Sequence, residues 1–178
     1  MNDIMIDIET LSTKPTSAIV AIGAVQFDRE TGDFKKEFYE LISLKSAIQY
    51  GQVDGSTIKF WLQQPDEARL ELTKSSQPLP ETLEKLKKWL PRNPSNMWAN
   101  GPSFDLVILE TAYGRCKINT PWGFWDHRCF RTIKDIGQEM GVKYEKSVSS
   151  DDVLHNALDD AKRQANYVCE VYKALYGF

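Results

Sequence analysis

The sequence predicts an α/β domain built on a mixed β-sheet. Three strand-like segments lie within the first 42 residues, helical patterns dominate from residue 56 onward, and one short apolar strand separates the helices at 96–99. Strands and helices in this order form a sheet covered by helices. The closely spaced early strands predict an antiparallel meander, whereas the later strand joins through a helical crossover, which places it parallel to its neighbour.

The early strands are read from their hydrophobic patterns. Isoleucines at 4, 6 and 8 alternate with Met5, Asp7 and Glu9, which is the period of a strand over 1–9. Residues 17–27 are nearly all apolar and small, as is typical of a strand buried on both faces. A turn at 28–32 leads to a third strand over 35–42, spaced for antiparallel pairing.

The remaining elements are mostly helices, read from capping residues and apolar spacing. Serine is a good N-cap and proline a good first helical residue. The expected helices begin at Ser56, Pro65, Pro80 and Ser103, and two more cover 130–140 and 156–175. All elements are expected to form one domain over 1–178, because this length suits a single hydrophobic core.

Composition narrows the classes of function. With 42% apolar and 26% charged residues, the chain reads as a soluble globular protein, and no segment is long and apolar enough to span a bilayer. The first residues do not resemble a signal peptide, so we expect a cytoplasmic protein without a membrane partner. Three widely spaced cysteines predict reduced thiols and no zinc site.

The net charge of −3 argues against tight binding of long duplex nucleic acid, because such binders usually carry a basic excess. It is compatible with an enzyme that holds a strand end, where bound divalent cations supply the positive charge.

Two carboxylates stand out in the first strand. Asp7 and Glu9 are two residues apart, so both side chains emerge on one face of the strand, within an otherwise apolar segment. Their negative charges repel, and a cation between them removes this cost. Carboxylate oxygens suit Mg²⁺ or Mn²⁺. A pair of acids on its own is common at solvated strand edges, so this observation alone leaves a metal site and a solvated pair equally open.

Three further polar residues lie later in the chain. Asp105 falls in the first turn of an expected helix, and His155 and Asp160 surround the start of the last one. A carboxylate in a first turn is also explained by the helix dipole alone. Histidine, in contrast, is the residue best suited to accept a proton near neutral pH. The five residues together predict an acidic metal centre with a histidine beside it.

The order of these residues resembles the DEDDh family of 3′–5′ exonucleases. The matching segments are 6–10 (IDIET), 100–105 (NGPSFD) and 155–161 (HNALDDA), and the resemblance runs from about residue 3 to 175. It looks closest to a compact branch with mycobacterial exoribonucleases and phage or prophage exonucleases, through residues 56–69. The resemblance implies a ribonuclease H-like fold.

The resemblance also implies a mechanism. Four carboxylates, Asp7, Glu9, Asp105 and Asp160, would hold two Mg²⁺ or Mn²⁺ ions. Asp7 would bridge both ions, Asp105 would favour the ion near the leaving 3′ oxygen, and His155 would take the proton from the attacking water. The chain would hydrolyse phosphodiester bonds from the 3′ end of DNA or RNA, as single strands or 3′ overhangs, and release nucleoside 5′-monophosphates by a two-metal mechanism.

Residues around the carboxylates are expected to contact substrate. The resemblance implies that the terminal nucleotide meets Ile8, Thr10, Leu11 and Phe104, and Trp61 is a further candidate as a stacking platform. Core packing explains Trp61 equally well, because its spacing from Ile58 and Leu62 is helical. Arg128 and Arg131 are candidate phosphate contacts.

Several alternatives remain open from the sequence. The same carboxylates could serve a Mg²⁺-dependent nucleotide phosphohydrolase, or the fold could be kept by a nucleic-acid-binding domain without activity. The sugar of the substrate, the oligomeric state and the origin are undetermined. Related enzymes often pair, so a homodimer is expected as a candidate state, and a phage-encoded protein would act in the host cytoplasm.

Overall fold

A computed structural model describes residues 3–74, 76–92, 94, 96–144 and 156–177 of the chain. In these residues a five-stranded sheet has the order β3-β2-β1-β4-β5. Its strands are β1 (Asp3–Thr10), β2 (Ile19–Phe27), β3 (Phe34–Leu41), β4 (Asn96–Ala99) and β5 (His127–Cys129).

The pairing follows the predicted mixture of directions. β1 pairs antiparallel with β2 and β2 with β3, whereas β4 runs parallel to β1 and β5 parallel to β4. The strand β1 is therefore the seam between the antiparallel meander and the parallel part of the sheet. The bounds of β4 agree with those predicted, while the edge strand β5 was not predicted.

Every predicted helix is present, and α1 is an additional helix that was not predicted. They are α1 (Leu44–Tyr50), α2 (Gly55–Leu62), α3 (Asp66–Glu71), α4 (Leu79–Trp89), α5 (Asp105–Arg115), α6 (Phe130–Glu139) and α7 (Ala157–Tyr176), with a 3₁₀ turn η1 (Phe124–Asp126). Helix α2 is capped by Asp54, whose carboxylate accepts from the Ser56 backbone N–H at 2.8 Å, and not by Ser56 as expected. Helix α5 begins after Phe104 without a side-chain cap, so Ser103 does not fill the expected role.

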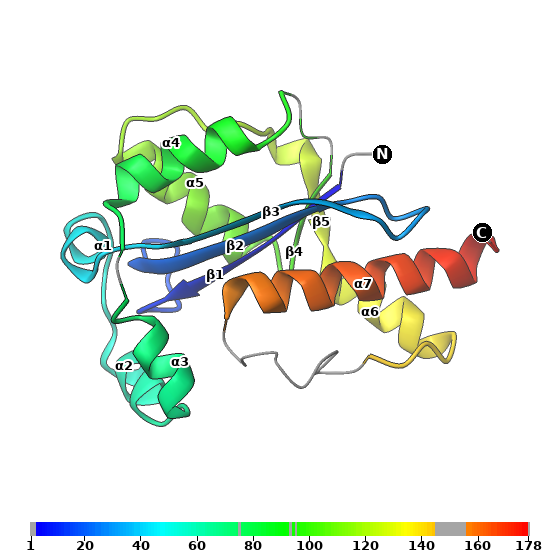
Figure 1. Ribbon diagram of the computed structural model, residues 1–178, viewed down its shortest axis with the longest axis horizontal. Coiled ribbons are helices and arrows are strands. Elements are labelled where there is room, and N and C mark those ends of the chain that lie inside the picture. Colours follow the sequence, from blue (N-terminus) through cyan, green and yellow to red (C-terminus); the bar gives the residue numbers. More distant parts are fainter. Residues whose placement is uncertain (1–2, 75, 93, 95, 145–155, 178) are drawn as a thin grey trace.

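The helices cover the two faces of the sheet. Figure 1 shows α4 and α5 on one face and α6 and α7 on the other, with α1, α2 and α3 at one end. Isoleucines at 4, 6 and 8 of β1 pack in the core shared with α4 and α5. Met5, one residue out of phase, packs in the second core with α6 and α7. Alternation along β1 thus sends Asp7 and Glu9 toward the α7 side.

Helix α7 approaches the sheet more closely than a side chain would allow. A Cβ added to Gly23 on β2 would lie 2.2 Å from the backbone of Ala157 and Leu158, in the first turn of α7. Gly23 is paired with Asp7 in the sheet register. The absence of a side chain at Gly23 therefore brings the start of α7 toward the strand that carries Asp7.

A buried ion pair holds the opposite end of the sheet. The Asp3 carboxylate, fully buried, accepts from the Trp98 indole N–H at 2.8 Å and lies 3.3 Å from Arg29 Nε. Arg29 donates to the Tyr172 hydroxyl at 2.9 Å and lies over its ring. These contacts join β1, β4, the turn after β2 and the last part of α7.

Two remaining expectations concern membrane-spanning helices and the cysteines. None of the helices in the described residues combines the length and the hydrophobicity needed to cross a bilayer. Cys116, Cys129 and Cys169 are all half-buried and outside any disulfide.

Candidate active site

Three carboxylates from distant parts of the chain converge at the end of β1. Asp7 and Glu9 project from β1, and Asp160 projects from the first turn of α7. One oxygen from each can be chosen so that all lie within 4.8 Å of one another, a spacing that a metal ion can bridge. The sequence places these residues in separate motifs, and the fold brings them to one point.

Asp105 completes the acidic group from the other side of the sheet. It is buried in the first turn of α5, and its Oδ1 accepts from the backbone N–H of Ile8 at 3.3 Å. This bond anchors the start of α5 to β1 between Asp7 and Glu9. Asp105 is close enough to raise the pKa of both through charge repulsion.

Burial and mutual repulsion make it unfavourable for all the carboxylates of the site to be ionised at once. Burial, followed by the negative charge of Asp105, raises the pKa of Asp7, and burial with the charges of Asp7 and Asp105 raises that of Glu9 well above its usual range. Burial also raises the pKa of Asp105, although the Ile8 N–H and the nearby Arg131 oppose it. Such a group of carboxylates ionises near neutral pH when a cation shares the site.

Two residues on α7 support the carboxylates, and the sequence analysis did not identify either. Gln164, one turn after Asp160, is buried and donates from Nε2 to Asp7 Oδ1 at 3.0 Å. Arg163, also buried, forms an ion pair with Asp160. Their amide and guanidinium groups hold the two carboxylates in a fixed orientation, as residues outside the ligand shell do in metal sites.

His155 lies outside the described residues, so its predicted position beside the carboxylates has no structural description. The helix that follows is described: the Asn156 side chain caps α7 by accepting from the backbone N–H groups of Leu158 and Asp159. This cap fixes the register that directs Asp160 toward β1. Asp159, the neighbouring acid, is not part of the group that the three carboxylates form.

A cavity of about 360 Å³ opens beside Glu9. Its lining includes four predicted substrate residues, Ile8, Thr10, Trp61 and Phe104, together with Thr13, Ser56, Thr57 and Phe60, which were not predicted to contact substrate. The volume is in the range of small-molecule sites.

Two neighbouring aromatic residues have different positions in this cavity. Trp61 is nearly buried, and its indole N–H donates to the Thr10 carbonyl at 2.9 Å, so it forms a fixed wall. Phe60 is exposed and packs edge-on against Trp61. The core-packing interpretation of Trp61 therefore holds alongside its place at the cavity, and Phe60 has the more exposed aromatic ring of the two.

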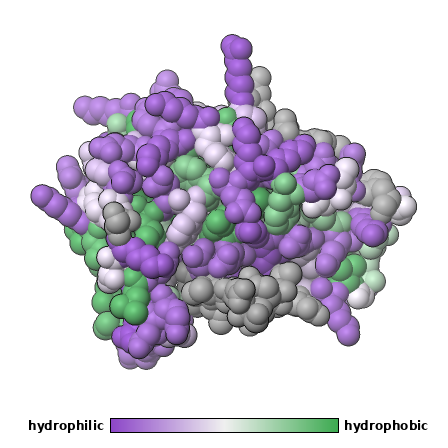
Figure 2. Space-filling model, in the orientation of Figure 1, coloured by the Kyte–Doolittle hydropathy of each residue, from purple (hydrophilic) through white to green (hydrophobic). Residues whose placement is uncertain are grey.

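Leu11 lies on the other side of Trp61. It lines an apolar groove of about 320 Å³ with residues of α1, α2 and α3, and it does not line the cavity beside Glu9. Figure 2 shows hydrophobic side chains gathered over this end of the molecule. The groove and the cavity are thus separated by one indole ring.

Comparison with known proteins gives the family. The model of the 3′–5′ exoribonuclease Rv2179c-like domain matches residues 2–172. The chain belongs to this family. No curated protein sequence matches it.

Solved structures share the fold at low identity. The nuclease domain of 3′hExo, a DEDDh family member bound to rAMP, superposes with a TM-score of 0.64 at 14% identity, covering 97% of this chain and 92% of that one. Cell-death related nuclease 4 superposes with a TM-score of 0.64 at 12% identity, and the match covers 97% of this chain and 64% of that one. Escherichia coli exonuclease I in complex with a dA16 oligonucleotide superposes with a TM-score of 0.68 at 10% identity, and the match covers 97% of this chain and 40% of that one.

The family match and the fold agree with the sequence analysis. The predicted mixed sheet of the ribonuclease H-like type is confirmed, and so is the assignment to the 3′–5′ exonucleases, while the fold is shared with a solved DEDDh nuclease. The protein is a 3′–5′ exonuclease, a hydrolase of phosphodiester bonds. The alternative of a binding domain without activity is not supported.

Proposed function

We propose that this exonuclease removes nucleoside 5′-monophosphates from the 3′ end of a single strand or 3′ overhang, using two divalent cations held by Asp7, Glu9, Asp105 and Asp160. The observation that carries the proposal is the convergence of three carboxylates within 4.8 Å, with Asp105 against the same strand. The adjoining cavity gives the terminal nucleotide a place beside Glu9.

The donor set fits Mg²⁺ or Mn²⁺. All ligands are carboxylate oxygens, which suit hard divalent cations, and neither histidine nor cysteine joins the group in the described residues. Ionising these acids in a partly buried site is unfavourable, and a bound cation offsets that free-energy cost. When bound, two such ions stabilise the attacking and leaving oxygens of the phosphodiester.

The residues of the chain then have separate roles. Gln164 and Arg163 hold Asp7 and Asp160 in place, which keeps the carboxylates preorganised before the substrate enters. His155 accepts the proton of the attacking water at its imidazole ring, a role that rests on the motif alone. The product leaves with its phosphate on the 5′ oxygen.

The cavity accounts for recognition of the terminal nucleotide. Ile8 and Phe104 supply apolar surface on two sides, and the exposed ring of Phe60 is placed to stack on a base. The ligands in the titles of two neighbours, rAMP for 3′hExo and dA16 for exonuclease I, have the chemistry that this cavity would take. The family description favours RNA as the first substrate to test.

The test is a time course on 5′-labelled RNA and DNA oligonucleotides with a 3′ overhang, in Mn²⁺ and in chelator. We expect a ladder that shortens from the 3′ end only with metal, and the faster ladder identifies the sugar. Asp7→Ala should abolish it, while Asp159→Ala, next to a proposed ligand but outside the acidic group, should keep most of it.

A second readout separates metal binding from catalysis. Calorimetric titration with Mn²⁺ should detect two bound ions in the wild type and fewer in Asp7→Ala. Shortening that persists in chelator, or hydrolysis of free nucleoside triphosphates in place of oligonucleotides, would contradict the proposal. The latter result would favour the nucleotide phosphohydrolase.

A further inference from the structure

Two neighbouring aromatic side chains outside the acidic group project into solvent. Phe124 is 79% exposed and Trp125 is 68% exposed, and they pack edge to face with ring centroids 4.9 Å apart. Both lie on η1, immediately before the edge strand β5. Large apolar side chains at this exposure are unfavourable in water unless they meet a partner.

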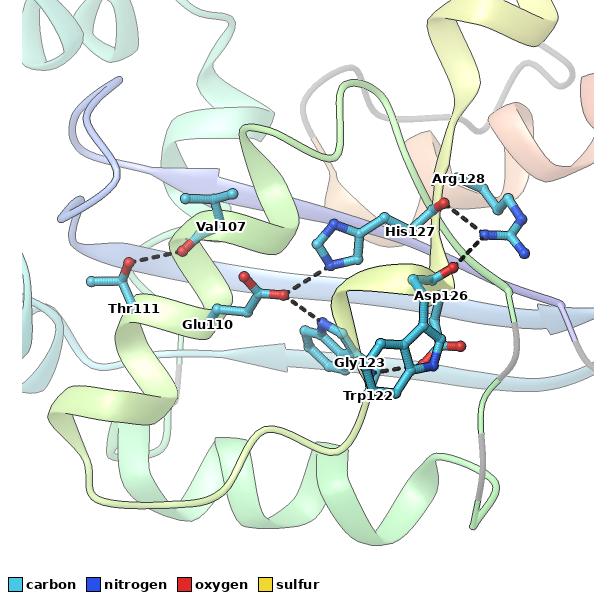
Figure 3. Close-up of polar contacts among 9 residues, drawn as sticks. Val107, Glu110, Thr111, Trp122, Gly123, Asp126, His127 and Arg128 are labelled. Atoms are coloured by element: carbon cyan, nitrogen blue, oxygen red, sulfur yellow. Dashed lines mark hydrogen bonds and ion pairs between the residues drawn. The ribbon is translucent and has the colours of Figure 1, made fainter.

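A partly buried set of hydrogen bonds holds this exposed pair in place. From the segment beside the pair, Trp122 and His127 both donate to Glu110 Oε1 of α5, at 3.0 and 2.8 Å, and Figure 3 shows the two rings pointing toward that carboxylate. The Gly123 N–H donates to Asp126 Oδ2 at 2.8 Å, which closes the turn. The exposed rings therefore sit on a rigid support.

The Trp125 ring also packs against Gly123, two residues earlier in the chain. A Cβ added to Gly123 would lie 2.4 Å from the Trp125 indole, so the ring lies flat against the bare glycine. The chain covers part of the ring, and the side chain as a whole remains 68% exposed. An exposed aromatic ring that is held in place is a platform on which a nucleobase can stack without sequence preference.

Basic side chains connect this platform with the acidic group. Arg128 donates from one guanidinium nitrogen to the carbonyls of Trp125 and His127, at 2.9 and 2.8 Å, which fixes its charge beside the platform. Arg131 donates to Asn100 Oδ1 at 3.4 Å, and its guanidinium covers Gly101 in the loop before α5. Positive charge thus runs from η1 toward the residue that begins α5, Asp105.

Two carboxylates near the platform belong to the hydrogen bonds that support it. Asp126 and Glu110 are both engaged in these hydrogen bonds. The combination of exposed aromatic rings with fixed guanidinium groups is the chemistry that binds single-stranded nucleic acid. It does not match a protein interface as well, because the basic residues continue from the rings toward the cleavage site.

We propose that the ridge formed by Phe124, Trp125, Arg128 and Arg131 binds the body of the substrate strand, on the 5′ side of the nucleotide that is removed. This inference rests on the proposed function, since it extends the same substrate beyond the cavity. From Trp125 to Arg131 the chain covers at most about 20 Å. That upper limit is roughly six nucleotides at the spacing of a stacked strand, and the proposal therefore expects a trinucleotide to leave the platform end of the ridge unoccupied.

The experiment compares a trimer with a twelve-mer of oligoadenylate, each as RNA and DNA, for the wild type and Trp125→Ala. We expect KM for the twelve-mer to rise roughly tenfold in the variant, the loss typical of one base–aromatic stack. KM for the trimer and kcat for both lengths should stay within about twofold. Trp125→Phe should recover most of the twelve-mer KM.

Two further variants separate the ridge from general effects. Arg128→Gln should make the plot of log affinity against log salt less steep for the twelve-mer by about 0.7, the value for one phosphate contact with a single strand. Tyr176→Ala removes an equally exposed aromatic ring at the far end of α7 and should change nothing.

Binding measured by fluorescence anisotropy in chelator makes the result independent of catalysis. If the wild type cleaves neither oligonucleotide, the proposed function fails, while a twelve-mer that loses affinity in Trp125→Ala still supports the ridge. Equal effects of Trp125→Ala on both lengths, or none on either, would overturn it. So would a change from dimer to monomer on gel filtration without a length-dependent effect.

Discussion

Replacing Gly23 by alanine should disturb the active site while leaving the protein folded. The added Cβ would lie 2.2 Å from backbone atoms of Ala157 and Leu158, whereas ordinary contact begins near 3.4 Å. Because the obstacle is backbone, the first turn of α7 must move by about 1 Å, and Asp160 moves with it.

The displacement should cost activity more than stability. A shift of about 1 Å in a catalytic group can lower a rate by roughly a hundredfold. Overpacking in a dense core costs about 1–3 kcal/mol. We therefore expect Gly23→Ala to stay folded with a lowered Tm, and to lose about two orders of magnitude in kcat/KM with weaker Mn²⁺ binding.

The assay is the oligonucleotide time course, with Mn²⁺ titration and thermal unfolding on the same preparations. Gly114→Ala is the matched control, because a Cβ there has no atom within 4 Å. It lies inside α5, so alanine should stabilise the helix by about 0.5–1 kcal/mol without affecting the rate. Gly23→Ala with wild-type activity and Tm would refute the argument that close approach of α7 sets the geometry.

Three other predictions follow from the described contacts. Gln164→Leu removes the donor to Asp7 and should raise the Mn²⁺ concentration for half-maximal rate by about 10–100-fold, with the fold unchanged by circular dichroism. Arg29→Met leaves the buried Asp3 carboxylate without its cation and should lower the free energy of unfolding by about 3–5 kcal/mol in urea titrations, part of which Asp3→Asn restores. The raised pKa of Asp7 and of Glu9 means that the native metal-free protein holds protons that the unfolded chain releases, so its stability falls as pH rises above about 4. The increase in Tm on adding Mn²⁺ should therefore be larger at pH 8 than at pH 5, and an increase that is independent of pH would contradict this.

The sequence allowed most elements of the sheet to be predicted, because strand alternation and apolar runs are local signals. It did not reveal β5, whose three residues become a strand only by pairing with β4. Helix α1 was also missed. It is short and depends on the Ser43 side chain that caps it and on the Leu79 N–H that donates to Ser46 at 2.9 Å, a contact made across 33 residues.

The proposed metal ligands were singled out through the order of the acidic motifs and the family resemblance that it carries, whereas the residues that support them gave no signal in the sequence. Gln164 is an ordinary helix residue in the sequence, and only the register of α7 against β1 places it beside Asp7. Trp61 was proposed as a stacking platform because aromatic faces bind bases. Its indole N–H donates to the Thr10 carbonyl, and the neighbouring Phe60 has the more exposed ring, a difference of one residue along α2 that spacing alone does not resolve.

The hydrogen bond from Gln164 to Asp7 spans 157 residues of sequence. A contact of that separation closes a long loop, and loop closure of this kind slows folding. A nascent chain still emerging from the ribosome carries Asp7 and Glu9 long before Asp160 is available. The group of three carboxylates therefore stays incomplete for as long as α7 remains unsynthesised, and on our proposal the binding of metal ions would report that both ends of the chain have come together.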